Sequence, residues 1–290
     1  MTYPVSIIGV GNMGGALARN LLSKGWPVAV FDLDSVKMRK LKPFGAIALD
    51  HHSDQAIHSI VTIVCVVDAA QTRDVLFGPD GIAKAVPLGH TVMLCPTLAP
   101  SEVEQMATEL NPHGLNTIDA PMSGGPARAN DGTMSLMVAC PDHVFVRHEA
   151  LINALSTQVF RISDKPGDGA RTKLVNNLLA GINLVGAAEA LAMAKRLGLD
   201  LHKTLDVIEK SSGQSWIGSD RMRRALQNDL APRAHMTLLG KDTRLAVEAA
   251  EAAGFHGPLG ASARDVFAQA SSGGLANMDD AALFNWLTKH

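Results

Sequence analysis

The sequence is poor in cysteine. Three cysteines, Cys65, Cys95 and Cys140, occur among 290 residues, and none belongs to a CxxC pair. This count excludes a small scaffold held by disulfides, and the spacing does not fit a zinc ribbon. We therefore expect reduced, buried thiols, as in a cytosolic protein, and no metal site.

Neither sign of charge is in excess. The chain has 26 Lys and Arg against 28 Asp and Glu, which gives a formal net charge of -2, and no basic stripe. A nucleic-acid partner therefore has no electrostatic support. Aromatic residues make up 4% of the chain and apolar residues 47%. We expect a well-buried core of closely packed small side chains.

The sequence also lacks a targeting segment or a clear membrane span. Residues 1–12 are apolar but have neither a basic start nor a cleavage site, so they fit a first strand better than a signal peptide. The run Ile60–Val67 is too short to cross a bilayer. The longer stretch Leu178–Ala194 contains Asn183 and Glu189, which favour a buried helix over a membrane span. We expect a cytoplasmic protein without a membrane partner.

The first part of the chain alternates between strand-like and helical segments. Apolar runs predict strands at Val5–Val10, Val28–Phe31, Ile60–Val67, Thr91–Leu94, Asn116–Ile118, Ser135–Ala139 and Gln158–Ile162. Helical segments fall between them. One of these covers Ser101–Leu110, where Ser101 would cap the helix and Glu104 would complete a capping box. The alternation implies a parallel, doubly wound sheet.

Beyond about Ser163 the pattern is helical throughout. Helices are expected at Gly169–Leu197, Leu201–Ser211, Trp216–Gln227, Thr237–Ala253 and Pro258–Ser271. A chain of 290 residues also exceeds what a single core usually holds. The sequence therefore predicts an α/β domain over residues 1–163 and an all-helical domain over residues 164–290.

A glycine-rich turn follows the first predicted strand. Gly9, Gly11 and Gly14 match the pattern GxGxxG and lead into a helix. The first glycine permits a tight turn, the second lets the backbone approach a pyrophosphate, and the third lets the helix pack on the strand. The helix start at Asn12 and Met13 offers free N–H groups to the phosphates. The motif predicts a Rossmann-like dinucleotide-binding domain; the alternative is an ordinary glycine-rich turn.

An acid after the second strand indicates which dinucleotide binds. Asp32 lies about twenty residues beyond the glycines, where a carboxylate accepts hydrogen bonds from the adenosine ribose. A carboxylate there would repel the extra 2′-phosphate of NADP. The sequence therefore favours NAD over NADP, whereas Asp34 fits a solvated turn residue.

A second glycine cluster follows the strand at Asn116–Ile118. Ser123, Gly124 and Gly125 precede Pro126, which suits the first turn of a helix. The two glycines would expose backbone N–H groups at the helix start, with the Ser123 hydroxyl as a further donor. Spacing alone leaves a structural turn and an anion site open. A substrate carboxylate would fit the second alternative.

A lysine and an asparagine share one face of the long predicted helix. Lys173 and Asn177 are four residues apart on an otherwise apolar segment. Hydride transfer from an alcohol carbon needs a matching proton transfer at the oxygen. A free lysine titrates near ~10.4, and burial would bring it closer to neutral pH as a base. The alternative is a solvated lysine near a helix start.

Four segments together resemble the β-hydroxyacid dehydrogenases, a family that includes 3-hydroxyisobutyrate dehydrogenase and 2-hydroxy-3-oxopropionate (tartronate semialdehyde) reductase. The resemblance extends along essentially the whole chain. It is carried by GVGNMG at 9–14, DAPMSGGPARANDGT at 119–133, GDGARTKLVNN at 167–177 and KDTRLA at 241–246. It implies that Lys173 is the catalytic acid/base, that Asn177 is its partner in substrate binding, and that Ser123, Gly124 and Gly125 hold the substrate carboxylate.

The resemblance also implies further cofactor contacts. Val66 and Val67 would lie under the adenosine side, and Thr97 would lie near the nicotinamide. Lys241 would reach the cofactor and the substrate from the helical domain. Without the family, Lys241 also fits a surface lysine paired with Asp242.

Within the family, the segment Ser211–Trp216 followed by Arg221 is similar to the L-threonate dehydrogenases. Its polar side chains would bind a polyhydroxylated chain beside Trp216, although the segment also fits a plain helix N-cap. The resemblance implies NAD-dependent oxidation of L-threonate to 2-oxo-tetronate. The alternatives are 2-hydroxy-3-oxopropionate reductase and 3-hydroxyisobutyrate dehydrogenase.

Relatives that use this fold as a scaffold without catalysis lack the lysine and carry extra domains. Imine reductases usually place another residue at its position. Because Lys173 is present, we expect an enzyme. The family favours a homodimer or a homotetramer.

Overall fold

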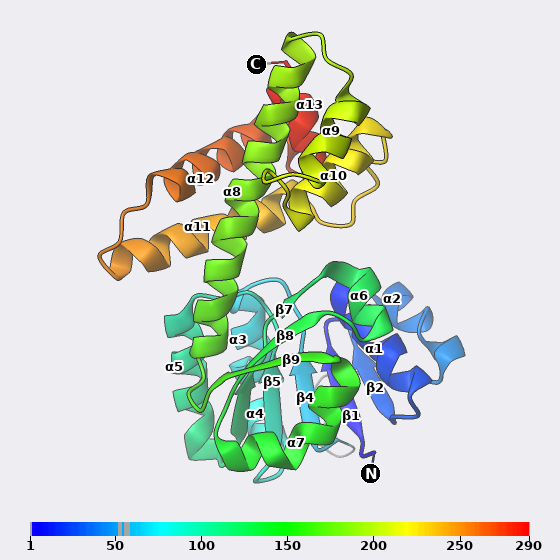
Figure 1. The fold of residues 1–290 in the computed structure, drawn as a ribbon. Coiled ribbons are helices and arrows are strands. Elements are labelled where there is room, and N and C mark those ends of the chain that lie inside the picture. Colours follow the sequence, from blue (N-terminus) through cyan, green and yellow to red (C-terminus); the bar gives the residue numbers. More distant parts are fainter. Residues whose placement is uncertain (1, 52–53, 55–58, 290) are drawn as a thin grey trace. The chain divides into compact units, whose positions relative to one another are not determined.

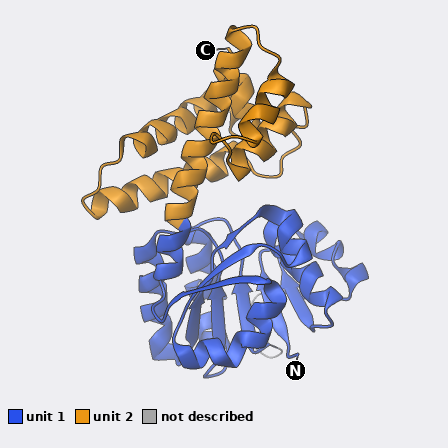
Figure 2. Ribbon diagram, in the orientation of Figure 1, with its two compact units in different colours: residues 1–173 blue, residues 174–290 orange. Residues whose placement is uncertain are grey.

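The computed structural model describes residues 2–51, 54 and 59–289. The chain divides into two compact units, unit 1 of residues 1–173 and unit 2 of residues 174–290 (Figure 2). The division falls inside helix α8 (Asp168–Arg196), beyond the boundary expected near residue 163. The start of α8 belongs to unit 1 because Ala170 packs into one of its cores.

Nine strands in the described part of unit 1 form one sheet (Figure 1). They are β1 (Val5–Ile8), β2 (Val28–Phe31), β3 (Ile47–Ala48), β4 (Val61–Val64), β5 (Thr91–Leu94), β6 (Asn116–Asp119), β7 (Met122–Ser123), β8 (Ser135–Ala139) and β9 (Gln158–Ser163). Their order is β3-β2-β1-β4-β5-β6-β8-β7, and β9 pairs with β8.

Helices cover both faces of this sheet (Figure 1). Those of unit 1 are α1 (Asn12–Ser23), α2 (Ser35–Arg39), α3 (Ala69–Phe77), α4 (Ile82–Ala85), α5 (Pro100–Leu110), α6 (Gly125–Asp131) and α7 (Asp142–Leu155). Along β1, Ile7 packs into a core with Leu17 of α1 and Leu151 of α7. The next residue, Ile8, packs into a second core with Met106 of α5. Successive side chains therefore enter opposite layers, and the predicted doubly wound α/β domain is confirmed.

The far side of the sheet differs from the fully parallel arrangement that the sequence predicts. Strand β8 is antiparallel to β6 and β7 and parallel to β9. A parallel return needs a crossover of a dozen or more residues. Helix α6 is a short helix between β7 and β8, so the chain turns back beside β7 instead.

The start of α5 also differs from the prediction. Ser101 does not cap the helix and Glu104 does not complete a box there, because the helix begins at Pro100. Proline suits the first helical turn, since its missing N–H is not needed there. Ala99 is the N-cap residue, and the Glu102 carboxylate accepts a hydrogen bond from the Ala99 N–H at 3.1 Å.

The strand order places the loops of interest at one edge. Strand β1 lies between β2 and β4, so the order of the strands reverses at β1. In open α/β sheets, ligands bind at the carboxyl ends of the strands at such a switch point. The segments after β1, β2, β4 and β5 meet at this edge because all four strands are parallel.

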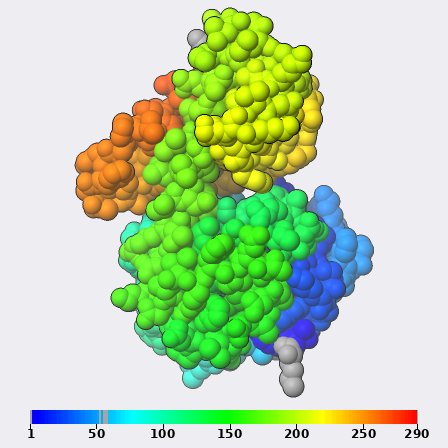
Figure 3. Space-filling view, in the orientation of Figure 1, coloured from blue at the N-terminus to red at the C-terminus, as the bar shows by residue number. Residues whose placement is uncertain are grey.

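Unit 2 is helical, as predicted. Besides the larger part of α8 it contains α9 (Leu201–Glu209), α10 (Trp216–Leu226), α11 (Met236–Ala252), α12 (Pro258–Ala270) and α13 (Leu283–Leu287). Its core joins Leu184 and Leu191 of α8 to Phe267 of α12. By length and composition alone α8 could cross a membrane; 39% of its most apolar window is buried in the structure. Another side of α8 lies at the surface of unit 2 (Figure 3).

The three cysteines are free thiols, as expected. Cys95 and Cys140 are buried, whereas Cys65 is only partly buried. Burial raises the pKa of Cys65 to about 12 and raises the pKa of the other two thiols as well. All three therefore stay protonated at neutral pH, which makes them poor nucleophiles.

Two histidines of unit 1, His90 and His148, are buried and hydrogen-bonded to hydroxyl groups. His148 receives or donates hydrogen bonds at both ring nitrogens, to the Tyr3 hydroxyl and the Thr91 hydroxyl at 2.8 Å each. The Nε2 atom of His90 lies 2.9 Å from the Thr62 hydroxyl. Burial lowers the pKa of each histidine to about 4. Both rings are therefore neutral in the folded protein at pH 7.

We predict that these histidines destabilise unit 1 in mild acid. The unfolded chain binds their protons near pH 6.5, so stability is complete above pH 6.5 and falls as the pH decreases toward 4. His148→Gln should flatten the slope of unfolding free energy against pH by up to about 1.4 kcal/mol per pH unit. Urea unfolding between pH 7.5 and 4.5 measures this slope.

Comparing the pH slopes of wild type and His148→Gln isolates the contribution of His148 to the unfolding free energy. Burial raises the pKa of Asp119 and of Asp280 to about 6, and their titration changes stability with the opposite sign in wild type and variant alike. His256→Gln, at an exposed histidine, is the matched control and should keep the wild-type slope. Equal slopes for wild type and His148→Gln would contradict the prediction.

Candidate functional site

The glycine turn after β1 packs tightly against the protein on one side and is open on the other. Gly9 has φ +86, and a Cβ there would lie 2.7 Å from the Cys65 carbonyl oxygen. A Cβ at Gly14 would lie 1.9 Å from the Gly9 carbonyl oxygen, so only glycine lets α1 start this close to the strand. A Cβ at Gly11 would meet no atom within 4 Å. The turn is closed toward the protein and open at Gly11, which fits the close approach of a pyrophosphate.

Asp32 holds the glycine turn in place. One carboxylate oxygen accepts a hydrogen bond from the Val10 N–H at 2.9 Å. The other accepts from the Asp34 N–H at 2.9 Å and lies 3.3 Å from Lys37 Nζ. Asp34 has a separate role as the N-cap of α2, where its side chain accepts from the Val36 N–H. Asp32 is therefore fixed at the edge of the turn, and Asp34 is a turn residue, as the sequence predicts.

The segments after β4 and β5 reach the same edge. The sheet ladder continues through the Cys65 N–H to Ile8 and the Cys95 N–H to Val64. A Cβ on Gly9 would lie 3.0 Å from a methyl group of Val66, so this side chain lines the turn. Val67 is exposed and Thr97 is partly buried. All of these positions follow neighbouring parallel strands.

The second glycine cluster joins β7 to α6. Gly124 and Gly125 have φ +132 and +76, values that favour glycine, and Pro126 lies in the first helical turn as predicted. A Cβ at Gly125 would meet no atom within 4 Å. Ser123 ends β7 directly before this opening. The cluster therefore presents backbone at a helix start to open space, which is compatible with an anion.

Asp119 is a residue that sequence reasoning passed over. It ends β6, and its buried carboxylate accepts hydrogen bonds from the N–H groups of Gly167 at 2.8 Å and Ala170 at 3.0 Å. A Cβ at Gly169 would lie 2.9 Å from the same carboxylate. Burial raises the pKa of Asp119 to about 6 although these backbone donors lower it. The carboxylate therefore fastens the first turn of α8 to the sheet.

Helix α8 carries the predicted lysine and asparagine in buried positions. Lys173 and Asn177 are each 6% exposed. They lie one turn apart on the same face of the helix. The alternative of a solvated lysine is therefore wrong. Burial of both polar side chains on an apolar helix is unusual unless they have partners.

Asn177 is held by the carboxylate of Asp242, which the sequence predicted only as a partner of Lys241. The Asn177 side-chain N–H donates to Asp242 at 2.6 Å, and the Asn176 amide donates to the Asn177 oxygen at 2.9 Å. Asp242 is 5% exposed, and its other oxygen lies 3.3 Å from Lys241 Nζ. A carboxylate only accepts hydrogen bonds, so it fixes which end of the Asn177 amide faces it.

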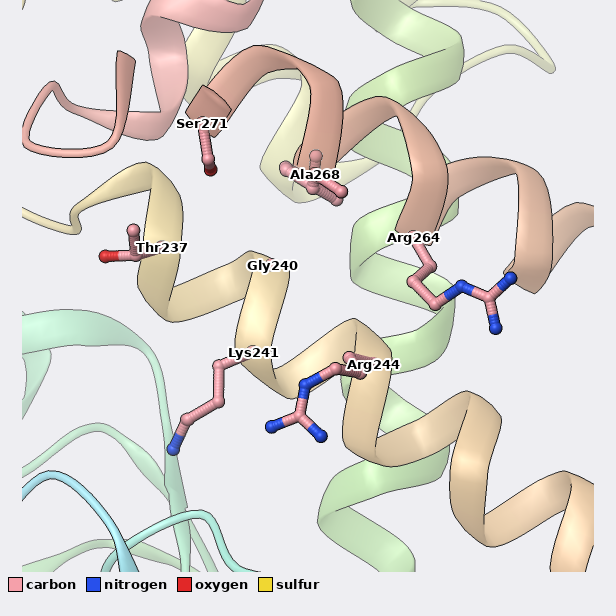
Figure 4. A pocket seen from close by; sticks show the side chains of 8 residues that line it. Thr237, Gly240, Lys241, Arg244, Arg264, Ala268 and Ser271 are labelled. Atoms are coloured by element: carbon pink, nitrogen blue, oxygen red, sulfur yellow. The ribbon is translucent and has the colours of Figure 1, made fainter. Parts of the chain in front are cut away.

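Lys241 also lines a groove between α11 and α12 in unit 2. The groove has a volume of about 280 Å³ and is bordered by three cationic side chains, those of Lys241, Arg244 and Arg264 (Figure 4). Carboxylates neutralise the two arginines: Arg244 pairs with Glu248 at 2.7 Å, and Arg264 pairs with an acid beside it. Of the three cations, Lys241 is the one joined to Asn177 through Asp242.

The polar segment before α10 is partly structural. Ser215 is the N-cap of α10 and its hydroxyl accepts from the Gly218 N–H at 3.1 Å. Trp216 begins the helix and is exposed. Arg221 binds Asp280 at 2.6 Å inside unit 2. Ser215 is therefore a helix N-cap, one of the two roles that the sequence left open for this segment. The Trp216 ring is exposed and could contact a ligand.

Two family models together match nearly the whole chain. A family model described as the NAD binding domain of 6-phosphogluconate dehydrogenase matches residues 4–163. A second, described as NAD-binding of NADP-dependent 3-hydroxyisobutyrate dehydrogenase, matches residues 167–287. Unit 1 is therefore an NAD-binding domain.

Similar proteins fall in the same group. L-Threonate dehydrogenase of Escherichia coli K12 is 34% identical over 97% of this chain and 93% of its own length. The 3-hydroxyisobutyrate dehydrogenase of Pseudomonas aeruginosa PAO1 is 33% identical, over 91% and 90%. A crystal structure of a 3-hydroxyisobutyrate dehydrogenase from Salmonella typhimurium has a TM-score of 0.92 and 34% identity, and covers 98% of this chain and 99% of that one.

We predict that Asp119 is essential for anchoring α8. Asp119→Ala leaves the buried N–H groups of Gly167 and Ala170 without their acceptor, which should lower the free energy of unfolding by about 3 kcal/mol. Asp119→Asn keeps an oxygen acceptor and should lose less. Chemical denaturation followed by circular dichroism measures both. Asp164→Ala, at an exposed acid nearby, should unfold like wild type; an unchanged midpoint for Asp119→Ala would refute the anchoring role.

Proposed function

The chain belongs to the β-hydroxyacid dehydrogenase family related to 3-hydroxyisobutyrate dehydrogenase, and we propose that its reaction is the oxidation of L-threonate to 2-oxo-tetronate with NAD. The family consists of NAD(P)-dependent oxidoreductases that act on a CH–OH group. Full-length similarity to L-threonate dehydrogenases of several bacteria supports the choice of substrate. The polar segment Ser211–Trp216, which would face a hydroxylated carbon chain, supports it as well.

The cofactor is proposed to bind at the switch point of the sheet. The open side of the turn at Gly11 fits its pyrophosphate, against the helix start at Asn12 and Met13. Asp32, at the edge of this turn, would accept hydrogen bonds from the adenosine ribose and disfavour NADP. Val66 would pack beside the turn. The bound nicotinamide supplies the hydride acceptor.

Further cofactor contacts are proposed on the neighbouring segments. Val67 would extend the apolar surface under the adenosine, and Thr97 would lie toward the nicotinamide. Both follow strands parallel to β1, whose carboxyl ends share its edge. Lys241 would add a cation from unit 2.

One observation carries the assignment of the chemistry: Lys173 and Asn177 are both buried on one face of α8. We propose that the substrate carboxylate binds the backbone N–H groups of Gly124 and Gly125 and the Ser123 hydroxyl. The neutral amine of Lys173 takes the proton of the substrate hydroxyl as hydride leaves the same carbon. The fixed amide of Asn177 positions that hydroxyl, and Asp242 keeps the amide oriented.

A second candidate is oxidation of 3-hydroxyisobutyrate. The relative from Pseudomonas aeruginosa and the structure from Salmonella typhimurium favour it, because both carry that name at similar identity. A branched apolar substrate would have no use for the polar segment before α10. Reduction of 2-hydroxy-3-oxopropionate is a third reaction of the same family and uses the same site in reverse.

The assembly and location are also proposals. We expect a homodimer or homotetramer in the cytoplasm. The bacterial relatives support a soluble protein, and reduced thiols suit that compartment.

Lys173→Ala should lower turnover by about 10²–10⁴-fold, because general-base catalysis contributes rate enhancements of this size. NAD affinity, measured by quenching of tryptophan fluorescence, should change little and also reports that unit 1 is folded. Lys165→Ala removes an exposed lysine before α8 and should turn over like wild type. Near-normal turnover of Lys173→Ala would exclude the proposed base.

An initial-rate screen should identify L-threonate with NAD as the pair with the highest kcat/KM. The screen compares L-threonate, 3-hydroxyisobutyrate and glycerate with NAD and with NADP, and 2-hydroxy-3-oxopropionate with NADH. A higher kcat/KM for 3-hydroxyisobutyrate would support the second candidate instead. No activity on L-threonate would reject the proposed substrate, and a preference for NADP would reject the proposed role of Asp32.

A further inference from the structure

Unit 1 contains a pocket at the amino end of β6, whereas the proposed cofactor contacts follow the carboxyl ends of neighbouring strands. The pocket has a volume of about 380 Å³, which is within the range of pockets that bind small molecules. Its walls come from one side of α5, the start of β6, the start of α7 and the loop before α8. Asn116 and Thr117, the first two residues of β6, both line it.

The side chain of Thr117 is buried in the wall of this pocket. Thr117 is 6% exposed, and its hydroxyl has no hydrogen-bond partner among the described residues. Because side chains alternate along a strand, it points to the same face of the sheet as Leu115, which packs into a core with Leu110 of α5. Residues of α5 line the pocket on that face. Since buried hydroxyls are nearly always paired, this one indicates a polar group that enters the pocket.

The backbone of Thr117 faces the side of β6 that is turned away from β5. The Asn116 N–H donates to the His90 C=O at 2.9 Å, and the Ala120 N–H donates to the Leu94 C=O at 2.8 Å. Both hydrogen bonds point toward β5. The backbone groups of successive residues in a strand alternate in direction, so the N–H and C=O of Thr117 both point to the outer side of β6.

The ladder between β6 and β8 on this outer side ends before it reaches Thr117. Asp119 pairs with Ala139, and the same register places Pro141 opposite Thr117. Pro141 has no N–H, and its C=O accepts from the Val144 N–H at 3.0 Å in the first turn of α7. Within the described ranges, no backbone group therefore pairs with the outer N–H and C=O of Thr117.

The walls of the pocket carry few charges. Glu104 pairs with Arg171 at the start of α8, which lies beside α5 (Figure 1). Of the described residues that line the pocket, none is a lysine or an arginine. Hydroxyl and amide side chains form the remaining walls together with apolar side chains and one imidazole, that of His143. A charged ligand would lose its hydration here without gaining a counter-ion, so the pocket suits an uncharged molecule.

We propose that this pocket binds a small, uncharged ring that carries an N–H next to a C=O, as a lactam or a pyrimidine base does. In an antiparallel ladder, a hydrogen-bonded residue exchanges two hydrogen bonds with the N–H and C=O of the residue opposite it. An adjacent donor and acceptor on a ring offer Thr117 the same pair of hydrogen bonds. The Thr117 hydroxyl donates to a further carbonyl of the ring.

An added polypeptide strand fits this edge less well than a single ring. Only Thr117 is open, because Asp119 already pairs with Ala139 on one side and the Leu115 N–H donates to the Leu110 C=O on the other. A strand needs several open residues to hold its register. The proposal does not depend on the proposed substrate or on the proposed cofactor site.

The first test uses two methylated uracils as probes. 1-Methyluracil keeps one ring N–H between two carbonyls and should bind with a dissociation constant of roughly 1 mM or lower. 1,3-Dimethyluracil has a methyl group in place of that N–H and should bind at least about tenfold more weakly. NMR titration of the full-length protein, isotope-labelled in threonine, should shift the amide signal of Thr117. Saturating NAD should leave the affinity for 1-methyluracil unchanged.

The second test removes the hydroxyl at nearly constant side-chain shape. Thr117→Val should weaken binding of 1-methyluracil about tenfold. It should not lower the urea midpoint of the free protein, because its hydroxyl has no hydrogen bond to lose. Thr72→Val is the matched control. Thr72 is also buried, but its hydroxyl donates to the Asp68 C=O at 2.7 Å and does not line the pocket. This variant should have a lower urea midpoint and should keep the wild-type affinity.

Four binding results would overturn the proposal. They are no binding of 1-methyluracil well above the expected dissociation constant, equal binding of the two uracils, competition by NAD, and an unchanged affinity of Thr117→Val. A lower urea midpoint of Thr117→Val would show that the hydroxyl has a partner within the chain, and it would overturn the proposal as well. Activity is not used as a readout, so failure here leaves the proposed reaction untouched.

Discussion

The hydrogen bonds of the buried Asp119 carboxylate are the interaction on which the position of the start of α8 in unit 1 depends. It ends strand β6 and accepts hydrogen bonds from the N–H groups of Gly167 and Ala170 at the start of α8, so the sheet is joined to the helix that carries Lys173 and Asn177. A carboxylate at the start of a helix also matches the positive end of the helix dipole. Gly169 leaves the space that this close contact needs. A single buried acid thus links the dinucleotide-binding sheet to the helix with the polar residues.

The sequence predicted the parts of the fold that have a strong local signal. Strands β2 and β5 have the predicted bounds, because the turn residues on either side of a short apolar segment mark where the strand begins and ends. The direction of β8 and the start of α5 were not predicted. The first depends on the length of α6, and the second on a proline whose effect competes with a good capping residue one position later.

Of the candidate site, the glycine turn was predictable from the sequence, whereas the roles of two buried acids were not. Glycines at fixed spacing identify a turn because few other residues tolerate its geometry, and Gly9 and Gly14 are such positions. Asp119 and Asp242 gave no comparable signal. Each acts on a residue distant in sequence, Asp242 on Asn177 and Asp119 on the backbone of α8. Their presence within the motifs was visible, but partners contributed by tertiary packing cannot be deduced from spacing.

The contact between Asp32 and the Val10 N–H has a consequence for the evolution of cofactor preference. The carboxylate proposed to select the ribose also supports the backbone of the glycine turn. A substitution that removes this acid to admit a 2′-phosphate would also take away the acceptor of the Val10 N–H in the glycine turn. A new acceptor for the Val10 N–H would offset the loss of this hydrogen bond. Under the proposed cofactor site, the preference for NAD and the shape of the turn depend on the same side chain.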